Sequence, residues 1–121
     1  MAKVYGVQEI ELRPDVTEAE FERYFREEIG TIERVFPGFK MCLAKSDRGA
    51  RNGKYAIVIE IESVEARNRM NPMPDVQSEE ARRLLEETGM GEALAKWDQY
   101  ASTITGESRS YDYVVVCEGP H

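Results

Sequence analysis

Residues 21–39 read FERYFREEIGTIERVFPGF. The apolar residues of this stretch recur every three or four positions, which is the spacing of one face of an α-helix. Thr17 and Glu20 form a capping box just before it, and a proline-glycine pair follows it. The spacing therefore predicts a helix that runs to about Phe36 and packs an apolar stripe against a sheet.

Strands are predicted on both sides of this helix. Residues 4–13 alternate between two faces, as a strand with one buried face does. Residues 40–45 and 54–61 form two further strands, joined by a polar turn that suits a hairpin. A last strand covers residues 111–117.

Helical segments are predicted between the third and the last strand. A short helix covers residues 64–70, and Ser78 caps another that pauses at Gly89 and Gly91 and resumes through Ile104. The order strand, helix, strand, strand, helix, strand is the split βαβ arrangement, in which the first and third strands are central. We therefore expect an α+β, ferredoxin-like βαββαβ fold with an antiparallel four-stranded sheet.

Size and charge limit the domain count and the partners. With 121 residues, of which 41% are hydrophobic, residues 1–121 form a single domain with one core. The net charge of -7 would repel phosphate backbones, so nucleic acid is not an expected partner. No apolar run approaches the ~20 residues that span a bilayer, and no signal peptide is recognised. We expect no membrane association and a cytoplasmic location.

The cysteines and the histidine offer little chemistry. Cys42 and Cys117 lie far apart and lack the spacing of metal or redox motifs, so we expect both to be small buried hydrophobes. The one histidine is His121, the last residue. We therefore expect no metal site and no cofactor, and only haem held by tyrosine or methionine stays open as an alternative.

The element order, with the first helix running into Pro37-Gly38-Phe39 and then a strand, resembles the dimeric α/β-barrel superfamily. That group includes antibiotic-biosynthesis monooxygenases, EthD-like and stress-responsive barrel proteins, and muconolactone isomerases. The resemblance implies a homodimer that packs open sheet faces together, with a small-molecule pocket between sheet and helices in each subunit. Several of these families carry a histidine near the end of the first helix. Residues 26–30 contain none, so chemistry that depends on it is not carried over.

The face of the sheet that points away from the helices supports the same dimer. Apolar area left in water costs roughly 25 cal/mol per Å², and dimerisation through this face removes that cost. The residues expected there are Val7, Ala56, Val58, Val114 and Val116.

Glu28 is the candidate catalytic residue. On a helix with 100° per residue it falls near the middle of the apolar stripe, whereas the other acidic residues between 18 and 33 fall outside. A carboxylate that points at the sheet must find a donor or take up a proton, and it could act as a general base. Alternatively, Glu28 reaches water or pairs with an arginine, and a distortion at Gly30 rotates it out of the stripe.

A ligand pocket is expected beside Glu28, where Gly6 leaves empty volume. Methionines near the broken helical region suit an adaptable lid, although methionine and tryptophan in such places are more often core. The candidate ligand-binding residues are Gln8, Tyr24, Tyr55, Met70 and Trp97. Three functions stay open: a cofactor-independent enzyme that transfers a proton or oxygenates a modest apolar substrate, a non-catalytic ligand-binding protein, and a stress-related structural homodimer.

Overall fold

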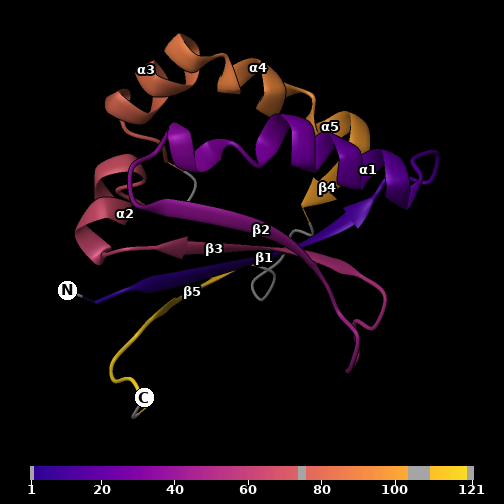
Figure 1. Cartoon of the computed structure of the whole chain (residues 1–121), viewed down its shortest axis with the longest axis horizontal. Helices are drawn as coiled ribbons and strands as arrows, with labels where there is room; N and C mark the ends of the chain where they lie inside the picture. Colours follow the sequence, from indigo (N-terminus) through magenta and orange to yellow (C-terminus); the bar gives the residue numbers. More distant parts are fainter. Residues whose placement is uncertain (1, 74–75, 104–109, 120–121) are drawn as a thin grey trace.

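A computed structural model of the chain describes residues 2–73, 76–103 and 110–119. A layer of helices covers one face of a single sheet, and the other face carries no helix (Figure 1). The strands are β1 (Val4–Leu12), β2 (Phe39–Lys45), β3 (Tyr55–Ile61), β4 (Ala101–Thr103) and β5 (Ser110–Val114). The helices are α1 (Glu18–Tyr24), α2 (Val64–Met70), α3 (Glu79–Thr88), α4 (Met90–Ala95) and α5 (Trp97–Tyr100), with a π-helical turn η1 (Phe25–Ile29) and a 3₁₀ turn η2 (Ile32–Arg34).

The sheet is antiparallel, with β1 and β3 at its centre. Its order is β2-β3-β1, and β4 and β5 share the remaining side of β1. β5 pairs with β1 from Val4 to Gln8, and β4 pairs with it from Ile10 to Leu12. This order confirms the predicted ferredoxin-like α+β fold. The sheet has five strands rather than four because two short strands occupy the fourth position.

The predicted helix through Ile104 is wrong at its end. α5 stops at Tyr100, and Ala101 is extended, with φ -148° and ψ 162°. Ala101 is fully buried opposite Leu12 in β1, and the Arg13 amide donates to the Tyr100 carbonyl oxygen at 2.9 Å. Pairing with β1 therefore overrides the helical spacing, while Ile104 itself lies outside the described residues.

The core lies between the helices and the sheet. Its largest cluster surrounds Phe21, which is fully buried and packs edge-on against the rings of Tyr55 and Trp97. A second cluster under α2 contains Val4 and Met70. Among the described residues, no helix combines the length and apolar character that crossing a membrane requires.

The helix-free face of the sheet, called the open face below, has an apolar centre. One row across it joins Cys42, Val58, Val7 and Tyr111, which are successive Cα partners. Val114 was expected here, but it pairs with Val4 and so shares the helix-facing side. The register of β5 places Tyr111 and Tyr113 on the open face instead, because side chains alternate along a strand.

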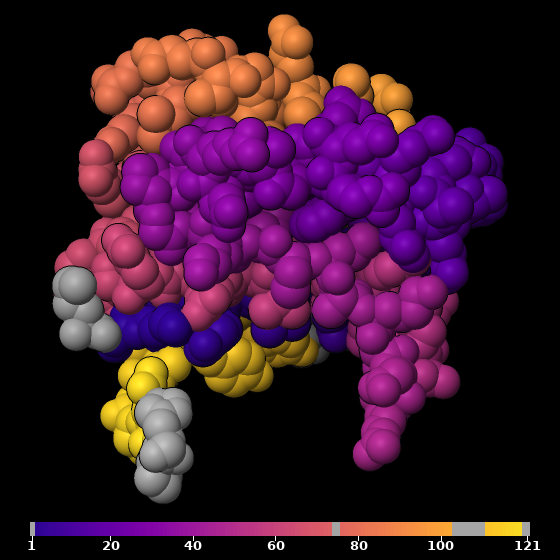
Figure 2. Space-filling model, viewed as in Figure 1, coloured from indigo at the N-terminus to yellow at the C-terminus, as the bar shows by residue number. Residues whose placement is uncertain are grey.

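Both cysteines are exposed in the single subunit, so the prediction that they are buried is wrong. Cys42 points from an edge strand toward the open face, where no layer covers it. Val116 lies beyond β5 and is 93% exposed. In Figure 2 the tip of the β2–β3 hairpin and the C-terminal segment project from the underside, and the surface between them is hollowed.

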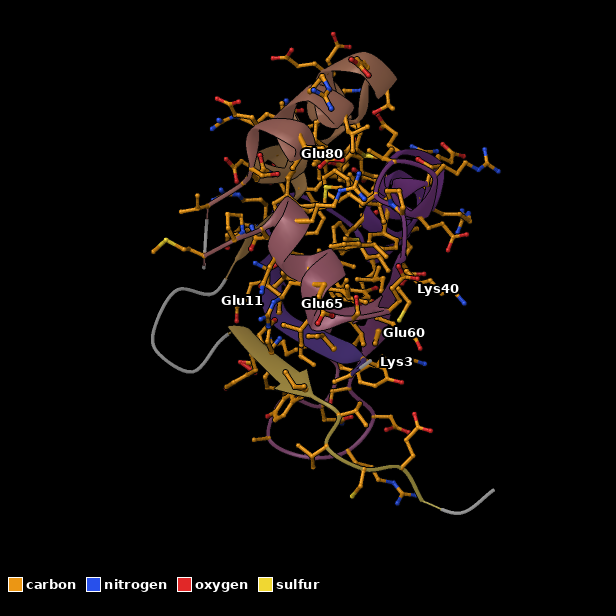
Figure 3. The ribbon with its side chains drawn as sticks, turned by 90° about the vertical axis from the view of Figure 1, so that its left-hand side faces the viewer. Lys3, Glu11, Lys40, Glu60, Glu65 and Glu80 are labelled. Carbon is orange, nitrogen blue, oxygen red and sulfur yellow. The ribbon has the colours of Figure 1, made fainter. Side chains whose placement is uncertain are left out.

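Charged side chains gather at one end of the open face, near the N-terminus. Lys3, Lys40 and Glu60 lie close together there (Figure 3), and the Lys3 Nζ is 2.7 Å from a Glu60 carboxylate oxygen. This contact lowers the pKa of Glu60, because the ammonium group favours the ionised carboxylate. The apolar centre of the open face therefore has a charged rim at this end.

Candidate ligand-binding site

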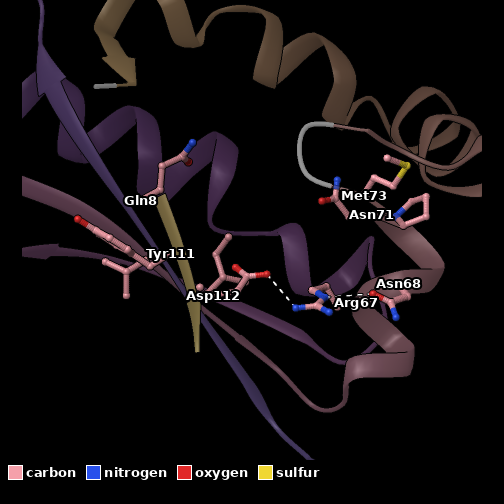
Figure 4. A pocket seen from close by; sticks show the side chains of 11 residues that line it. Gln8, Arg67, Asn68, Asn71, Met73, Tyr111 and Asp112 are labelled. Atoms are coloured by element: carbon pink, nitrogen blue, oxygen red, sulfur yellow. Dashed lines mark hydrogen bonds and ion pairs between the residues drawn. The ribbon is translucent and has the colours of Figure 1, made fainter. Parts of the chain in front are cut away.

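A cavity of about 560 Å³ opens between β1, β5 and α2 with the segment that follows it. Its volume falls within the range of small-molecule sites. Figure 4 shows Gln8 and Asp112 on the sheet side and Arg67, Asn68 and Asn71 on the helix side. The described lining consists of Gly6, Val7, Gln8, Ile59, Arg67, Asn68, Asn71, Pro72, Met73, Tyr111 and Asp112.

Gly6 forms the floor of the cavity. It lies in the middle of the sheet, with Ile59 as its Cα partner on one side and Asp112 on the other. A Cβ at this position would lie 3.1 Å from the Asp112 Oδ1, which is tighter than an ordinary contact. The absence of a side chain at residue 6 therefore leaves room above the strand, as the sequence predicted.

α2 supplies the opposite wall. Ser63 caps this helix by accepting a hydrogen bond from the Ala66 amide at 3.0 Å. Arg67 and Asn71 are four residues apart and so lie on the same side of the helix. The Asn71 side-chain amide donates to the Val76 carbonyl oxygen at 2.9 Å, which fixes its direction. Met70, 2% exposed, anchors α2 in the core below.

Arg67 and Asp112 join the two walls. The Arg67 Nη1 is 3.0 Å from the Asp112 Oδ2, and the Arg67 Nε donates to the Asn68 Oδ1 at 3.2 Å. The two charged side chains point toward one another in Figure 4. Because the Asp112 side chain is half exposed, the pair contributes little to stability. Its main effect is to place opposite charges side by side in the cavity.

Glu28 lies elsewhere, on the side of the first helix that faces α4 and α5. Its carboxylate is 34% exposed and lies 2.8 Å from the Lys96 Nζ. This bond raises the pKa of Lys96. The expectation of a buried carboxylate that points at the sheet is therefore wrong, and the catalytic role of Glu28 stays a prediction.

The π-helical turn explains this difference. The Gly30 amide donates to the Phe25 carbonyl oxygen at 2.7 Å, which is an i→i+5 bond instead of i→i+4. A turn with an extra residue rotates side chains less per residue than the 100° of a regular helix. Glu28 consequently leaves the apolar stripe, while Phe25 and Ile29 stay buried.

Of the five candidate ligand-binding residues, the structure places only Gln8 in this cavity. Tyr24, Tyr55 and Trp97 pack with Phe21 in the core, and Met70 lies in another cluster. Burial is the main cause of the raised pKa of Tyr24, about 12. Burial and the hydrogen bond from the Tyr55 hydroxyl to the Glu22 carboxylate raise the pKa of Tyr55.

The sequence reasoning missed Arg67, Asn68, Asn71 and Asp112. A signal existed in the short capped helix, which carries a guanidinium and two amides after Ser63. Asp112 could be found only by fixing the register of the last strand, because a shift of one residue turns its side chain to the other face.

Fold and cavity together define a ferredoxin-like α+β domain with a cavity on the helix side of its sheet that is lined by both apolar and polar groups. No protein-family model matches the sequence, and no curated protein matches it either. Among solved structures, SnoaB, a cofactor-independent oxygenase from Streptomyces nogalater, is similar over 99% of this chain and 97% of its own, with a TM-score of 0.55 and 17% identity.

Two further structures share the fold. A protein from Arabidopsis thaliana is similar over 100% of this chain and 99% of its own, with a TM-score of 0.51 and 10% identity. A dimeric ferredoxin-like protein of unknown function from Thermobifida fusca YX is similar over 94% and 92%, with a TM-score of 0.50 and 11% identity. At these identities the likenesses confirm the ferredoxin-like fold.

Proposed function

We propose that this chain binds a small organic molecule in the cavity over Gly6. The observation that carries the proposal is the composition of the lining. Ile59, Pro72 and Met73 offer apolar surface, and amide and charged groups from two separate elements converge on the same space. A mostly apolar surface with a few convergent polar groups is the usual composition of a small-molecule site.

A thermal-shift screen tests this proposal. The library contains equal numbers of small aromatic and alicyclic acids, amines and uncharged molecules. Each hit is then titrated against the wild type, Gly6→Val, which fills the floor, and Asn71→Ala, which removes a wall group. The matched control is Gly119→Ala, since a Cβ at Gly119 meets nothing within 4 Å.

We expect Gly6→Val to weaken the hits by at least about tenfold, because side-chain volume replaces ligand volume. Circular dichroism checks that the variant is folded, and Asn71→Ala supplies a second, milder perturbation. A screen without hits, or hits that are insensitive to both variants, contradicts the proposal.

A second candidate function is catalysis, namely cofactor-independent oxygenation, and the likeness to SnoaB favours it. In such a reaction the substrate itself supplies the electrons that reduce O₂, so the protein must bind and orient it and stabilise its anion. Within the described lining, Asp112 is the carboxylate and Arg67 is the cation available for this. We assign the proton-accepting role to Asp112, and Glu28 stays the alternative.

Oxygen consumption in the presence of screen hits distinguishes the two carboxylates. We expect Asp112→Asn to abolish turnover, and Glu28→Gln, which changes a residue outside the cavity lining, to leave it unchanged. The reverse result would return the catalytic role to Glu28. Ligand binding without oxygen consumption by the wild type would leave a non-catalytic binding protein.

We also propose that two copies form a homodimer through the open face. The row from Cys42 to Tyr111 supports this, since it leaves apolar side chains without a covering layer. Figure 2 shows a hollow between the hairpin tip and the C-terminal segment, on the side of the molecule where the second copy would pack. The structure from Thermobifida fusca YX is itself described as dimeric.

A further inference from the structure

We propose that the cavity selects an uncharged ligand, and that Arg67 and Asp112 set this preference by neutralising one another. The inference rests on the proposed small-molecule function and adds the chemical class of the ligand. Arg67 and Asp112 carry the only formal charges in the described part of the lining.

The geometry makes the two charges a single neutral unit. The Arg67 Nη1 and the Asp112 Oδ2 are 3.0 Å apart, and Arg67 also donates through its Nε to Asn68. Each of the two bidentate edges of the guanidinium thus has one of its donor nitrogens, Nη1 or Nε, already engaged. A free bidentate edge, which an arginine uses to bind a carboxylate, is therefore not presented to the cavity.

The other polar groups of the described lining carry no formal charge. The side chains of Gln8, Asn68 and Asn71 are amides, each of which carries donor and acceptor atoms. The Asn71 amide nitrogen already donates to the Val76 carbonyl oxygen, so the side-chain oxygen of Asn71 is the atom that can accept a hydrogen bond from a ligand. Amide and hydroxyl groups of an uncharged ligand can donate to and accept from these side-chain amides, so no formal charge on the ligand is needed.

Solvation decides between charged and uncharged ligands. An ion that enters the cavity loses water, and this costs more than desolvating an amide or a hydroxyl group. Close to Arg67, an anion would also approach Asp112, so attraction and repulsion nearly cancel. The same cancellation holds for a cation near Asp112. Neither ion therefore gains enough attraction from the pair to offset its desolvation cost. A neutral polar ligand has a much smaller desolvation cost to offset.

Three ligands with the same ring system and similar size test the inference: 2-naphthamide, 2-naphthoate and 2-naphthylmethylammonium, titrated by calorimetry at low salt. We expect the amide to bind the wild type at least about tenfold tighter than either ion. Asp112→Asn leaves Arg67 unpaired and should move the preference toward the naphthoate. Arg67→Gln leaves Asp112 unpaired and should move it toward the ammonium compound.

The double variant Arg67→Gln/Asp112→Asn is the matched control. It lacks the ion pair but restores neutrality, so we expect it to prefer the amide again. Circular dichroism confirms folding of all three variants. A wild type that prefers the naphthoate, or a ranking that stays the same in both single variants, would overturn the inference.

The screen described above distinguishes a failure of the proposed function from a failure of this inference. If no hit is sensitive to Gly6→Val, the proposed function fails and this inference fails with it. If sensitive hits exist but are mostly acids or amines, the proposed function stands and this inference alone is wrong. If none of the three naphthalene compounds binds, the charge of the sensitive hits decides in the same way.

Discussion

Tyr24 is the last residue of α1, and its hydroxyl donates to the Ala93 carbonyl oxygen in α4. Its ring stacks on that of Tyr100, with the ring centres 4.1 Å apart. Burial, and secondarily the nearby Glu28 carboxylate, raise its pKa from 10.0 to about 12. Below pH 10 the phenol is neutral in both the folded and the unfolded chain. Between pH 10 and about 12 the unfolded chain releases this proton first, so stability falls as the pH rises.

We therefore expect Tyr24→Phe to lose about 1 kcal/mol of unfolding free energy at pH 7, because the Ala93 carbonyl oxygen loses its partner. The same variant should lose less additional stability than the wild type between pH 10 and 12. Urea unfolding at several pH values measures both effects. An unchanged alkaline slope in Tyr24→Phe would contradict the assignment.

Residue-level prediction from the sequence succeeded where the position depends on strand alternation alone. Gly6 and Gln8 line a cavity, because a strand of known phase places them there. For Glu28 the helical wheel failed and the alternative of a distortion at Gly30 held, because the bond from the Gly30 amide to the Phe25 carbonyl oxygen breaks the regular helix that the wheel assumes. A π-helical turn has no sequence signature comparable to a capping box.

One side chain adds to the contacts between the β2–β3 hairpin and the neighbouring strand β1. The Arg51 guanidinium donates to the carbonyl oxygens of Ile10, at 3.2 Å, and Tyr55, at 2.7 Å, and its Nε lies 3.5 Å from the Glu9 carboxylate. Arg51 therefore satisfies backbone carbonyl groups near the point where the pairing of β1 with β3 ends.

Arg51→Ala should lower the free energy of unfolding by about 2 kcal/mol, since partly buried hydrogen-bond acceptors lose a charged donor. Arg48→Ala changes an exposed arginine in the same turn and should cost less than about 0.5 kcal/mol. Urea unfolding of the two variants compares them directly. Equal losses would show that Arg51 acts only through its charge on the hairpin.

At the level of elements, the sequence predicted what local signals determine. Caps at Thr17, Ser63 and Ser78 mark the starts of the three longer helical segments correctly. The β4 strand was missed because Ala101 fits the helical spacing and becomes extended only through pairing with β1. Long-range pairing of this kind is not encoded in the residues close by.

At the level of the molecule, the proposed dimer depends on the open face. Val58 lies in its central row, so Val58→Lys should place a charge in the interface and yield monomers. Gln99→Lys adds the same charge at an exposed position of α5, away from the open face, and should leave the dimer intact. Sedimentation velocity measures both. A dimer that survives Val58→Lys, with the fold intact, would contradict the open face as interface.

Cys42 offers an independent measure of the same interface. Its thiol is exposed in one subunit but would be covered by a second copy. In a Cys117→Ser background, we expect Cys42 to react slowly with Ellman's reagent at high protein concentration. Dilution, or Val58→Lys, should accelerate the reaction. Equal rates under all conditions would show that the open face is free.

The division of the last edge strand has a consequence for changes in the length of the chain. β1 holds β5 as far as Gln8 and holds β4 from Ile10 onward, so each piece keeps its own register. Residues 104–109 join two strands that are already anchored. We therefore expect a change in the length of this connection to leave both registers unchanged, since neither pairing with β1 depends on the other.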